Sequence, residues 1–146
     1  MINMIQNMNL FQNRKYEVFM EIKEIARKIK EENGNLYLVG GAIRDKLLER
    51  TIKDEDYCVT GITAEKFKEI FPKAFLRGKA FEVFDLYGRE FALARRERKI
   101  GLGHKEFEIE TGGNITIEED LARRDITINS IAQDVLTGKI IDPFGR

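Results

Sequence analysis

Hydrophobic and polar residues recur along this chain with two periods, one typical of helices and one typical of strands. Apolar side chains at helical spacing predict an amphipathic helix over residues 14–32, which Asn33-Gly34-Asn35 ends. Further helices are expected over 42–50, 63–70 and 118–130, and strands over 36–39, 54–60, 74–76, 81–86, 90–95, 131–135 and 139–141. The glycine-rich stretch 100–114 is predicted to be an irregular excursion. Helices mixed with mostly antiparallel strands predict an α+β fold.

Length and composition indicate a single folded domain. A chain of 146 residues suits one core, so we expect one domain over residues 14–146 and an N-terminal extension over 1–13. Hydrophobic residues make up 42% and charged residues 34%, which argues against disorder. No apolar run is long enough to span a membrane, no membrane partner is expected, and no secretory signal is visible. The single cysteine, Cys58, fits a reducing cytoplasm.

The net charge is zero, with 25 basic and 25 acidic residues. Many nucleic-acid-binding domains are strongly basic, because phosphate neutralisation drives their affinity. Basic residues do cluster at Arg95–Lys99 and at Arg123-Arg124, although such clusters can also be solvated faces. Any nucleic-acid partner must therefore be held by a local patch or by something outside this chain.

Gly40 and Gly41 stand where a predicted strand turns into a predicted helix. Glycines at such a junction expose amide donors at the positive end of the helix dipole, which suits a phosphate group. An ordinary tight turn is the competing interpretation, and for a glycine pair alone it is the more common one. Arg44 and Asp45 follow on the helix and can pair with each other or orient the loop.

Asp54 and Asp56 lie two residues apart on a predicted strand, so their carboxylates point to one face. Two close carboxylates repel and need a cation or a proton to coexist. Hard oxygen ligands favour Mg²⁺, which keeps waters and substrate phosphates in its shell. Glu55 projects to the other face and is expected to be a bystander or a surface residue. The alternative is an acidic turn, but Tyr57 continues the segment as a strand of buried character.

A two-metal centre usually needs a third carboxylate, and Glu90 is the best candidate. It opens a strand on which Ala92 and Ala94 share its face and leave room for a ligand. A charged residue at the end of a hairpin is about as good an interpretation of this strand alone. Weaker candidates for the third carboxylate are Glu82, Asp85 and Glu97.

The segment from Arg123 to Asn129 carries further polar groups on a predicted helix. Arg123 or Arg124 can clamp a triphosphate, because a guanidinium binds phosphate bidentately and stays charged. Asp125 and Asn129, at i and i+4, share one side of the helix. Asn129 can bind a ribose hydroxyl or brace the loop, and Asp125 can hold an arginine or a ribose. The alternative is an ordinary charged amphipathic helix. The only histidine, His104, has no cysteine or histidine companion, so neither zinc binding nor a histidine base is expected.

The segments LVGGAIRD, KDEDY, EFALARRERK, EEDLARRDITINS and IIDPFGR occur in this order from about Leu36 to the last residue. Together they resemble the head domain of the bacterial class II tRNA nucleotidyltransferase/poly(A) polymerase family. The run ALARRERK is more similar to CCA-adding enzymes than to poly(A) polymerases. This resemblance implies a polymerase-β-like nucleotidyltransferase fold, in which helices flank a small, mixed, mostly antiparallel sheet.

The resemblance also implies roles for the candidate residues. Asp54 and Asp56 match the family's Mg²⁺ ligands, and Glu90 matches its third acidic residue. The residues that match the motif near the incoming triphosphate are Gly40, Gly41, Arg44 and Asp45. Those that match the segment holding the nucleotide's sugar and phosphates are Arg123, Arg124, Asp125 and Asn129.

The implied activity is transfer of a nucleoside monophosphate from ATP or CTP to an RNA 3′-hydroxyl, with release of pyrophosphate. The tRNA 3′ CCA end is the favoured substrate. The family's neck, body and tail domains read the base and grip tRNA; they are absent from this sequence, so we expect RNA to be held through them or through a partner chain. One alternative is a nucleotide-binding or regulatory module without turnover, against which the three acidic residues weigh. The other is a minimal nucleotidyltransferase acting on a different substrate, against which the arginine segment weighs.

Overall fold

The computed structural model describes residues 20–43, 55–77, 82–99, 101, 107–124 and 130–144. The helices in this part of the chain are α2 (Ile22–Glu31), α4 (Ala64–Ile70) and α5 (Ile117–Ala122). The strands are β1 (Asn35–Val39), β2 (Asp56–Thr60), β3 (Phe75–Arg77), β4 (Val83–Leu86), β5 (Arg89–Leu93), β6 (Arg95–Lys99), β7 (Phe107–Thr111), β8 (Ala132–Asp134) and β9 (Ile140–Ile141). The N-terminal extension predicted over 1–13 lies outside the described residues.

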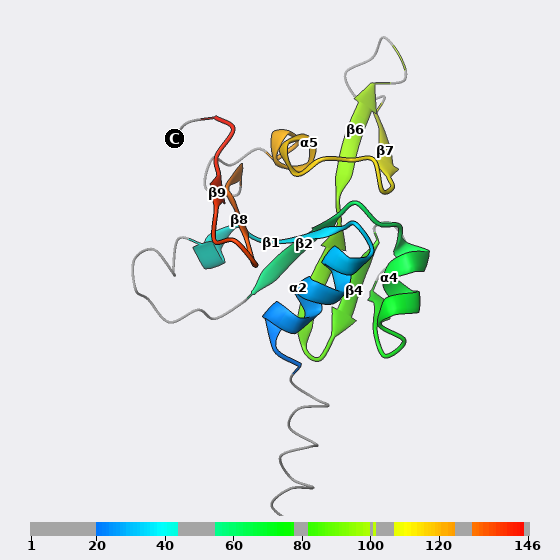
Figure 1. Cartoon of the computed structure of the whole chain (residues 1–146). Helices are drawn as coiled ribbons and strands as arrows, with labels where there is room; N and C mark the ends of the chain where they lie inside the picture. The colour runs from blue at the N-terminus through cyan, green and yellow to red at the C-terminus, as the bar shows by residue number, and fades with distance from the viewer. Residues whose placement is uncertain are drawn as a thin grey trace, which may run out of the picture.

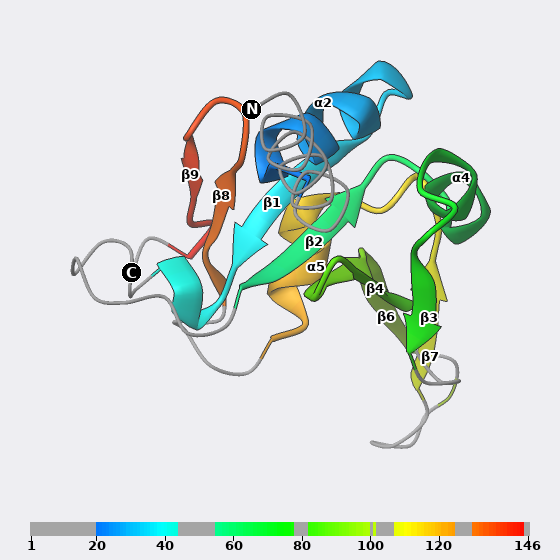
Figure 2. The same ribbon diagram turned by 90° about the horizontal axis from the view of Figure 1, so that it is seen from below.

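The main sheet has the strand order β3-β4-β5-β2-β1-β8-β9 (Figure 1, Figure 2). Every neighbouring pair is antiparallel except β2 and β5, which run parallel. The predicted turn between β4 and β5 is present, and Tyr87 and Gly88 both have positive φ there, as a tight hairpin turn requires. The α+β class and the mostly antiparallel sheet are therefore confirmed.

Helices cover the two faces of this sheet unequally. In Figure 1, α2 and α4 lie below the sheet and α5 lies above it. The alternation along β2 explains the two layers. Tyr57 and Val59 pack in the core between the sheet and helices α2 and α4, whereas Cys58 packs in a second core, between the sheet and α5. We call these two surfaces the α2/α4 face and the α5 face.

The amphipathic N-terminal helix is present, with Ile25, Ala26 and Ile29 buried. It ends where the sequence indicates, because Asn33 adopts a φ of 68° and Gly34 follows. A Cβ on Gly34 would lie 2.7 Å from the Ile29 side chain, so only glycine fits this close approach. The described helix begins at Ile22; residues 14–19 of the predicted range lie outside the described part of the chain.

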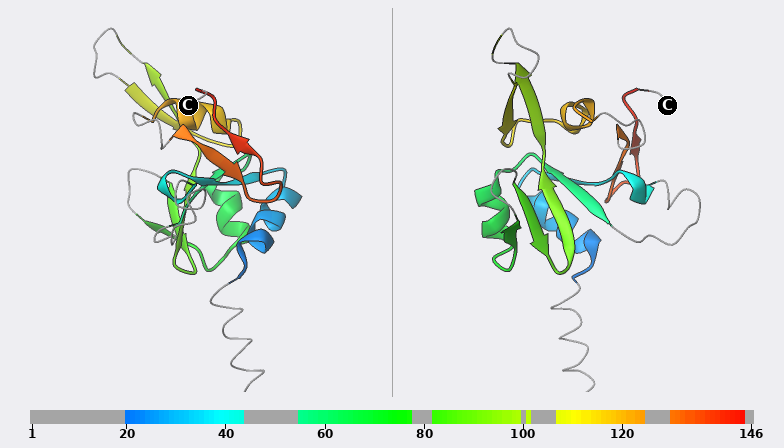
Figure 3. Two further views of the ribbon diagram at one scale, coloured as in Figure 1. Left: turned by 90° about the vertical axis from the view of Figure 1, so that its left-hand side faces the viewer. Right: turned by 180° about the vertical axis from the view of Figure 1, so that it is seen from behind.

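Three predictions differ from the structure. The strand expected over 90–95 is divided at Ala94 between β5 and β6, and β6 continues to Lys99. Residues 107–111, expected in an irregular excursion, form β7 and pair with β6, so that Arg96 stands opposite Glu110. The glycines around this segment obscured its period-two pattern. The resulting ribbon projects away from the main sheet (Figure 3). The helix predicted over 118–130 ends earlier, since α5 has its C-cap at Arg123.

The structure also bears on membrane association. Within the residues that it describes, no helix has the length and apolar character needed to cross a bilayer.

Candidate functional site

Three strand ends meet at one edge of the sheet. Val39, the last residue of β1, pairs with Asp56, the first residue of β2. Asp56 in turn pairs with Glu90 on the parallel strand β5. Because paired residues on adjacent strands point to the same face and strands lie about 4.8 Å apart, the two carboxylates are neighbours. Both residues are exposed, so a ligand can reach them from solvent.

The row of carboxylates extends one strand further. Asp85 on β4 pairs with Glu90, so acidic residues occupy one line across β2, β5 and β4. Arg77 stands beside two of them, with Nη1 3.0 Å from Glu90 Oε1 and Nη2 2.9 Å from Asp85 Oδ2. Among the described residues, no three possible ligands come together as a metal site. Asp54, the other predicted metal ligand, lies outside them.

The glycine turn lies at the same edge. Gly40 directly follows Val39, has a φ of 73°, and accepts a hydrogen bond of 3.2 Å from the Ile43 amide. Residues 41–43 are helical, so a strand, a glycine turn and the start of a helix succeed one another beside Asp56, as predicted. The predicted triphosphate residues Arg44 and Asp45 lie outside the described residues.

Arg123 and Arg124 lie on the α5 face and share one buried carboxylate. Asp120 is 1% exposed and accepts hydrogen bonds from Arg123 Nη2 at 3.1 and 3.3 Å and from Arg124 Nη2 at 3.3 Å. Asp120 is not among the residues predicted from the sequence. Its position three and four residues before the two arginines does indicate, however, that it can contact them from a helix. Asp125 and Asn129 lie outside the described residues.

A third arginine, Arg95, lies near Asp120. Burial, and then the nearby Arg123, lower the pKa of Arg95. Burial, and then Asp120, raise the pKa of the Cys58 thiol, which therefore stays neutral. Within the described part of the chain, Arg95, Arg123 and Arg124 thus lie close to the carboxylate of Asp120 and form an arginine cluster. The Nε groups of Arg123 and Arg124 are buried and have no hydrogen-bond partner in the described part of the chain.

The cluster and the carboxylate edge are adjacent. Cys58, which lies beside Asp120, is two residues from Asp56 on the same face of β2. At about 3.3 Å per residue, this spacing is about 6.6 Å. The α5 face therefore presents exposed carboxylates at its edge and, next to them, guanidinium groups with unused hydrogen-bonding capacity.

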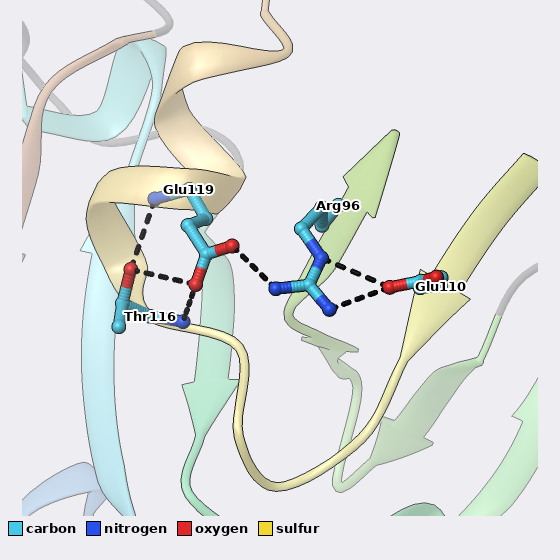
Figure 4. Close-up of polar contacts among 4 residues, drawn as sticks. All are labelled: Arg96, Glu110, Thr116 and Glu119. Carbon is cyan, nitrogen blue, oxygen red and sulfur yellow. Dashed lines mark hydrogen bonds and ion pairs between the residues drawn. The ribbon is translucent and has the colours of Figure 1, made fainter. Parts of the chain in front are cut away.

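A polar clamp fixes α5 against the β6–β7 ribbon (Figure 4). Arg96 donates to Glu110 from Nε at 2.9 Å and to Glu119 from Nη1 at 2.8 Å. Glu119 also completes a capping box with Thr116 at the start of α5. The hydrogen bond from Arg96, followed by that from the Thr116 amide, lowers the pKa of Glu119. The clamp holds in place the helix that carries Asp120 and leads into the arginines.

The opposite face carries a second polar network, at the same end of β2. Glu55, expected to be a bystander or a surface residue, is partly exposed, but it accepts hydrogen bonds from the Tyr57 hydroxyl at 2.8 Å and from Arg89 Nε at 3.1 Å. Arg89 also donates to the Met20 carbonyl at 3.0 Å. The residues that flank Asp56 and Glu90 in sequence thus tie β2, β5 and the start of α2 together.

Carboxylates at strand ends, beside a glycine turn and an arginine cluster that follows a helix, place the molecule in the class with the polymerase-β-like nucleotidyltransferase fold. Residues 36–145 match the family model described as the poly A polymerase head domain. The chain belongs to this family.

Known relatives agree with this assignment. The chain is 49% identical over 113 residues to the multifunctional CCA protein of Haemophilus ducreyi, and 51% identical over 112 residues to that of Pseudoalteromonas atlantica. Each match covers 75% of this chain, and the chain spans only 27% of each relative's length.

Solved structures show the same fold. The CCA-adding enzyme of Bacillus stearothermophilus in complex with CTP is 34% identical, with a TM-score of 0.63 over 88% of this chain and 30% of the other. A tRNA nucleotidyltransferase complexed with a primer tRNA and an incoming ATP analogue is 32% identical, with a TM-score of 0.58 over 83% of this chain and 34% of the other. The fold predicted from the motifs is therefore confirmed.

Proposed function

We propose that this chain is the catalytic head of a CCA-adding tRNA nucleotidyltransferase. In this proposal it transfers a nucleoside monophosphate from ATP or CTP to the 3′-hydroxyl of tRNA and releases pyrophosphate. The similar solved structures include complexes with CTP and with a primer tRNA and an ATP analogue, which support this substrate class. A free, buried Cys58 is compatible with a reducing compartment, and we place the activity in the cytoplasm.

The arginine cluster is the main structural support for triphosphate binding. Among the described residues, Arg123 and Arg124 share one carboxylate, that of Asp120, so positive charge exceeds negative charge in this pair of contacts, and each arginine has a buried Nε–H group without a partner there. Buried unsatisfied donors are unfavourable unless a ligand or a rearrangement satisfies them. A triphosphate supplies both the missing charge and the missing acceptors. We assign Arg123 and Arg124 to the triphosphate, and Asp125 and Asn129 to the nucleotide's sugar and phosphates.

The carboxylate edge suits a divalent cation. Asp56 and Glu90 are adjacent, exposed and on one face, and their hard oxygen donors are those that Mg²⁺ prefers. We assign Asp56, with Asp54, as the metal ligands and Glu90 as the third acidic residue. Bound Mg²⁺ would neutralise the triphosphate and favour ionisation of the attacking hydroxyl. Gly40 and Gly41, with Arg44 and Asp45, are assigned to the phosphates at this edge.

The division of labour between these groups follows from their positions. In this proposal the glycine turn and the arginines contact the phosphates, and the carboxylates at the strand ends bind the metal. Phosphate contacts are the same for every base, so selection of ATP or CTP and the grip on tRNA must come from groups elsewhere. In this proposal they come from further domains or from a partner chain.

Incorporation of labelled nucleotides into tRNA that lacks its CCA end tests the proposal. The chain would be incubated with Mg²⁺, with ATP and CTP, alone and with candidate partner domains, beside its Asp56→Ala variant. We expect incorporation by the parent and none by the variant. If the parent binds Mg²⁺ and triphosphate but adds nothing under any of these conditions, the nucleotide-binding module without turnover replaces our proposal.

A further inference from the structure

Arg77, the last residue of β3, connects two acidic residues of the carboxylate row. Its Nη1 lies 3.0 Å from Glu90 Oε1 and its Nη2 lies 2.9 Å from Asp85 Oδ2. One guanidinium therefore contacts the third acidic residue of the proposed site and a second carboxylate on the neighbouring strand. Such a planar fork is suited to holding two carboxylates in a fixed relative orientation.

The register of the sheet explains how these three side chains meet. Phe75 pairs with Asp85 and Asp85 pairs with Glu90, so these residues point to the same face. Arg77 is two residues from Phe75 on the same strand and therefore shares this face. Asp56 lies on the same face, because Glu90 pairs with Asp85 on one neighbouring strand and with Asp56 on the other.

Asp85 anchors the arginine. Its side chain is only 9% exposed, and its Oδ1 accepts a hydrogen bond of 3.3 Å from the Gly88 amide in the hairpin turn. Two carboxylates directly opposite each other on adjacent strands repel, and the guanidinium between Asp85 and Glu90 offsets that repulsion. The Arg77 side chain is 53% exposed, and ion pairs at such exposure contribute little to stability. The arrangement is therefore better suited to orienting a carboxylate than to stabilising the fold.

We propose that Arg77 is a positioning residue, which Asp85 holds in place and which fixes the carboxylate of Glu90 for cation binding. Because Arg77 holds Oε1 of Glu90, the other carboxylate oxygen would remain available to a divalent cation at the carboxylate edge. This inference rests on the proposed function, because it requires a divalent cation at the carboxylate edge. Neighbours that orient a metal ligand in this way commonly change metal affinity about 10–100-fold when they are removed.

Charge and positioning predict opposite effects of removing Arg77. Arg77→Met removes a positive charge beside the carboxylates, so electrostatics alone would tighten cation binding. If Arg77 instead orients Glu90, the same change weakens binding. Lys73→Met is the matched control, because Lys73 is exposed just before β3 and its loss changes the net charge by the same amount.

Binding of Mn²⁺ to the full chain, measured from the electron paramagnetic resonance signal of the free ion, separates these effects. We expect Arg77→Met to raise the Mn²⁺ Kd about tenfold and Lys73→Met to leave it unchanged. The effect of Arg77→Met should disappear in a Glu90→Gln background, since the arginine acts through that carboxylate. Urea unfolding of each variant, without metal, should give midpoints close to that of the parent.

The outcomes distinguish failure of the positioning role of Arg77 from failure of the cation site itself. If the parent binds Mn²⁺ and Arg77→Met binds it equally well or more tightly, the positioning role of Arg77 is refuted and the proposed site stands. The role is also refuted if Arg77→Met weakens binding by the same factor in the Glu90→Gln background. If the parent itself binds no Mn²⁺, the cation site fails and the inference fails with it.

Discussion

The two faces of the sheet are built from the same strands but differ in composition. On the α2/α4 face, aromatic rings form a continuous apolar core, in which Phe67 contacts Phe71, Phe84 and Phe91 at centroid distances of 5.0, 4.8 and 5.7 Å. On the α5 face, a smaller apolar cluster shares the surface with buried Asp120, its arginines and the carboxylate edge. One face stabilises the domain, and the other presents polar groups to a ligand.

This difference shows how a small domain can stay folded although its candidate site reduces its stability. Buried charges that are incompletely paired reduce stability, whereas close-packed aromatic rings supply it. Because successive residues of a strand point to opposite faces, Asp56 and Tyr57 serve the two purposes side by side. Substitutions on the α5 face should therefore change binding and chemistry, and substitutions beneath α2 and α4 should change stability.

The largest effect is expected at the carboxylate edge. Asp56→Ala removes a proposed metal ligand and should lower nucleotide transfer by about 10²–10³-fold, as loss of one group that stabilises the transition state does. The change also relieves repulsion with Glu90, so thermal stability without metal should hold or rise slightly. Transfer assays and thermal melts on the same preparation check both parts. Turnover equal to that of the parent would remove Asp56 from the site.

The second largest effect is a loss of stability expected from substitutions in the core of the α2/α4 face. Phe67 is 0% exposed in the aromatic core, and Phe67→Ala should lower the free energy of unfolding by about 3–5 kcal/mol. Phe75→Ala is the matched control, because Phe75 is 55% exposed and its loss should cost less than about 0.5 kcal/mol. Urea denaturation measures both. Similar costs for the two variants would contradict the assignment of the core.

Asp120→Asn should affect both stability and binding, because this residue is buried and holds the arginines. Losing its charge-assisted hydrogen bonds should lower the free energy of unfolding by about 1.5–3 kcal/mol. Triphosphate affinity should fall as well, since Arg123 and Arg124 lose the carboxylate that orients them. Denaturation and calorimetric titration together check this prediction. A variant with altered stability and unchanged affinity would limit Asp120 to a structural role.

The smallest effect concerns pH and the clamp on α5. The folded-state pKa of Glu119 lies below its ordinary value of 4.5, so its contribution to stability is present above pH 4.5 and is lost as the pH falls through the folded pKa. Arg96→Met removes the first cause of that shift. Its stability should therefore depend less steeply on pH below 4.5 than that of the parent, as unfolding curves at successive pH values would show. Parallel curves would exclude the Arg96–Glu119 pair as the source.

How much of this arrangement the sequence predicts depends on the range of the interactions involved. Local alternation and turn residues were enough for the strand that carries Asp56 and for the hairpin before Glu90. Nothing local indicates that β2 and β5, more than thirty residues apart in the chain, pair in parallel with Asp56 beside Glu90; the motif resemblance suggested their common site. The role of Asp120 depends on burial under tertiary contacts, which a charged segment does not reveal.

Two further differences have similar physical causes. The strand β7 was missed because its alternating residues lie among glycines, and pairing with β6 stabilises an extended segment that has weak local preference. Alternation places Glu55 on the face of β2 away from Asp56 and by itself predicts a bystander or a surface residue. Its partner Arg89 comes from a different strand, so the sequence pattern could not show that Glu55 is held on the α2/α4 face.

The central claim is that the arginine cluster of the α5 face binds the phosphates of a nucleoside triphosphate. Calorimetric titration of the parent, Arg123→Met and Arg124→Met with ATP and with AMP, all in Mg²⁺, tests it most directly. Each variant should lose about 1.5–3 kcal/mol of ATP binding, which is about tenfold or more in affinity, and much less AMP binding, because AMP lacks the β- and γ-phosphate oxygens. Equal losses for the two ligands would contradict the claim and assign these arginines to RNA binding or to structure.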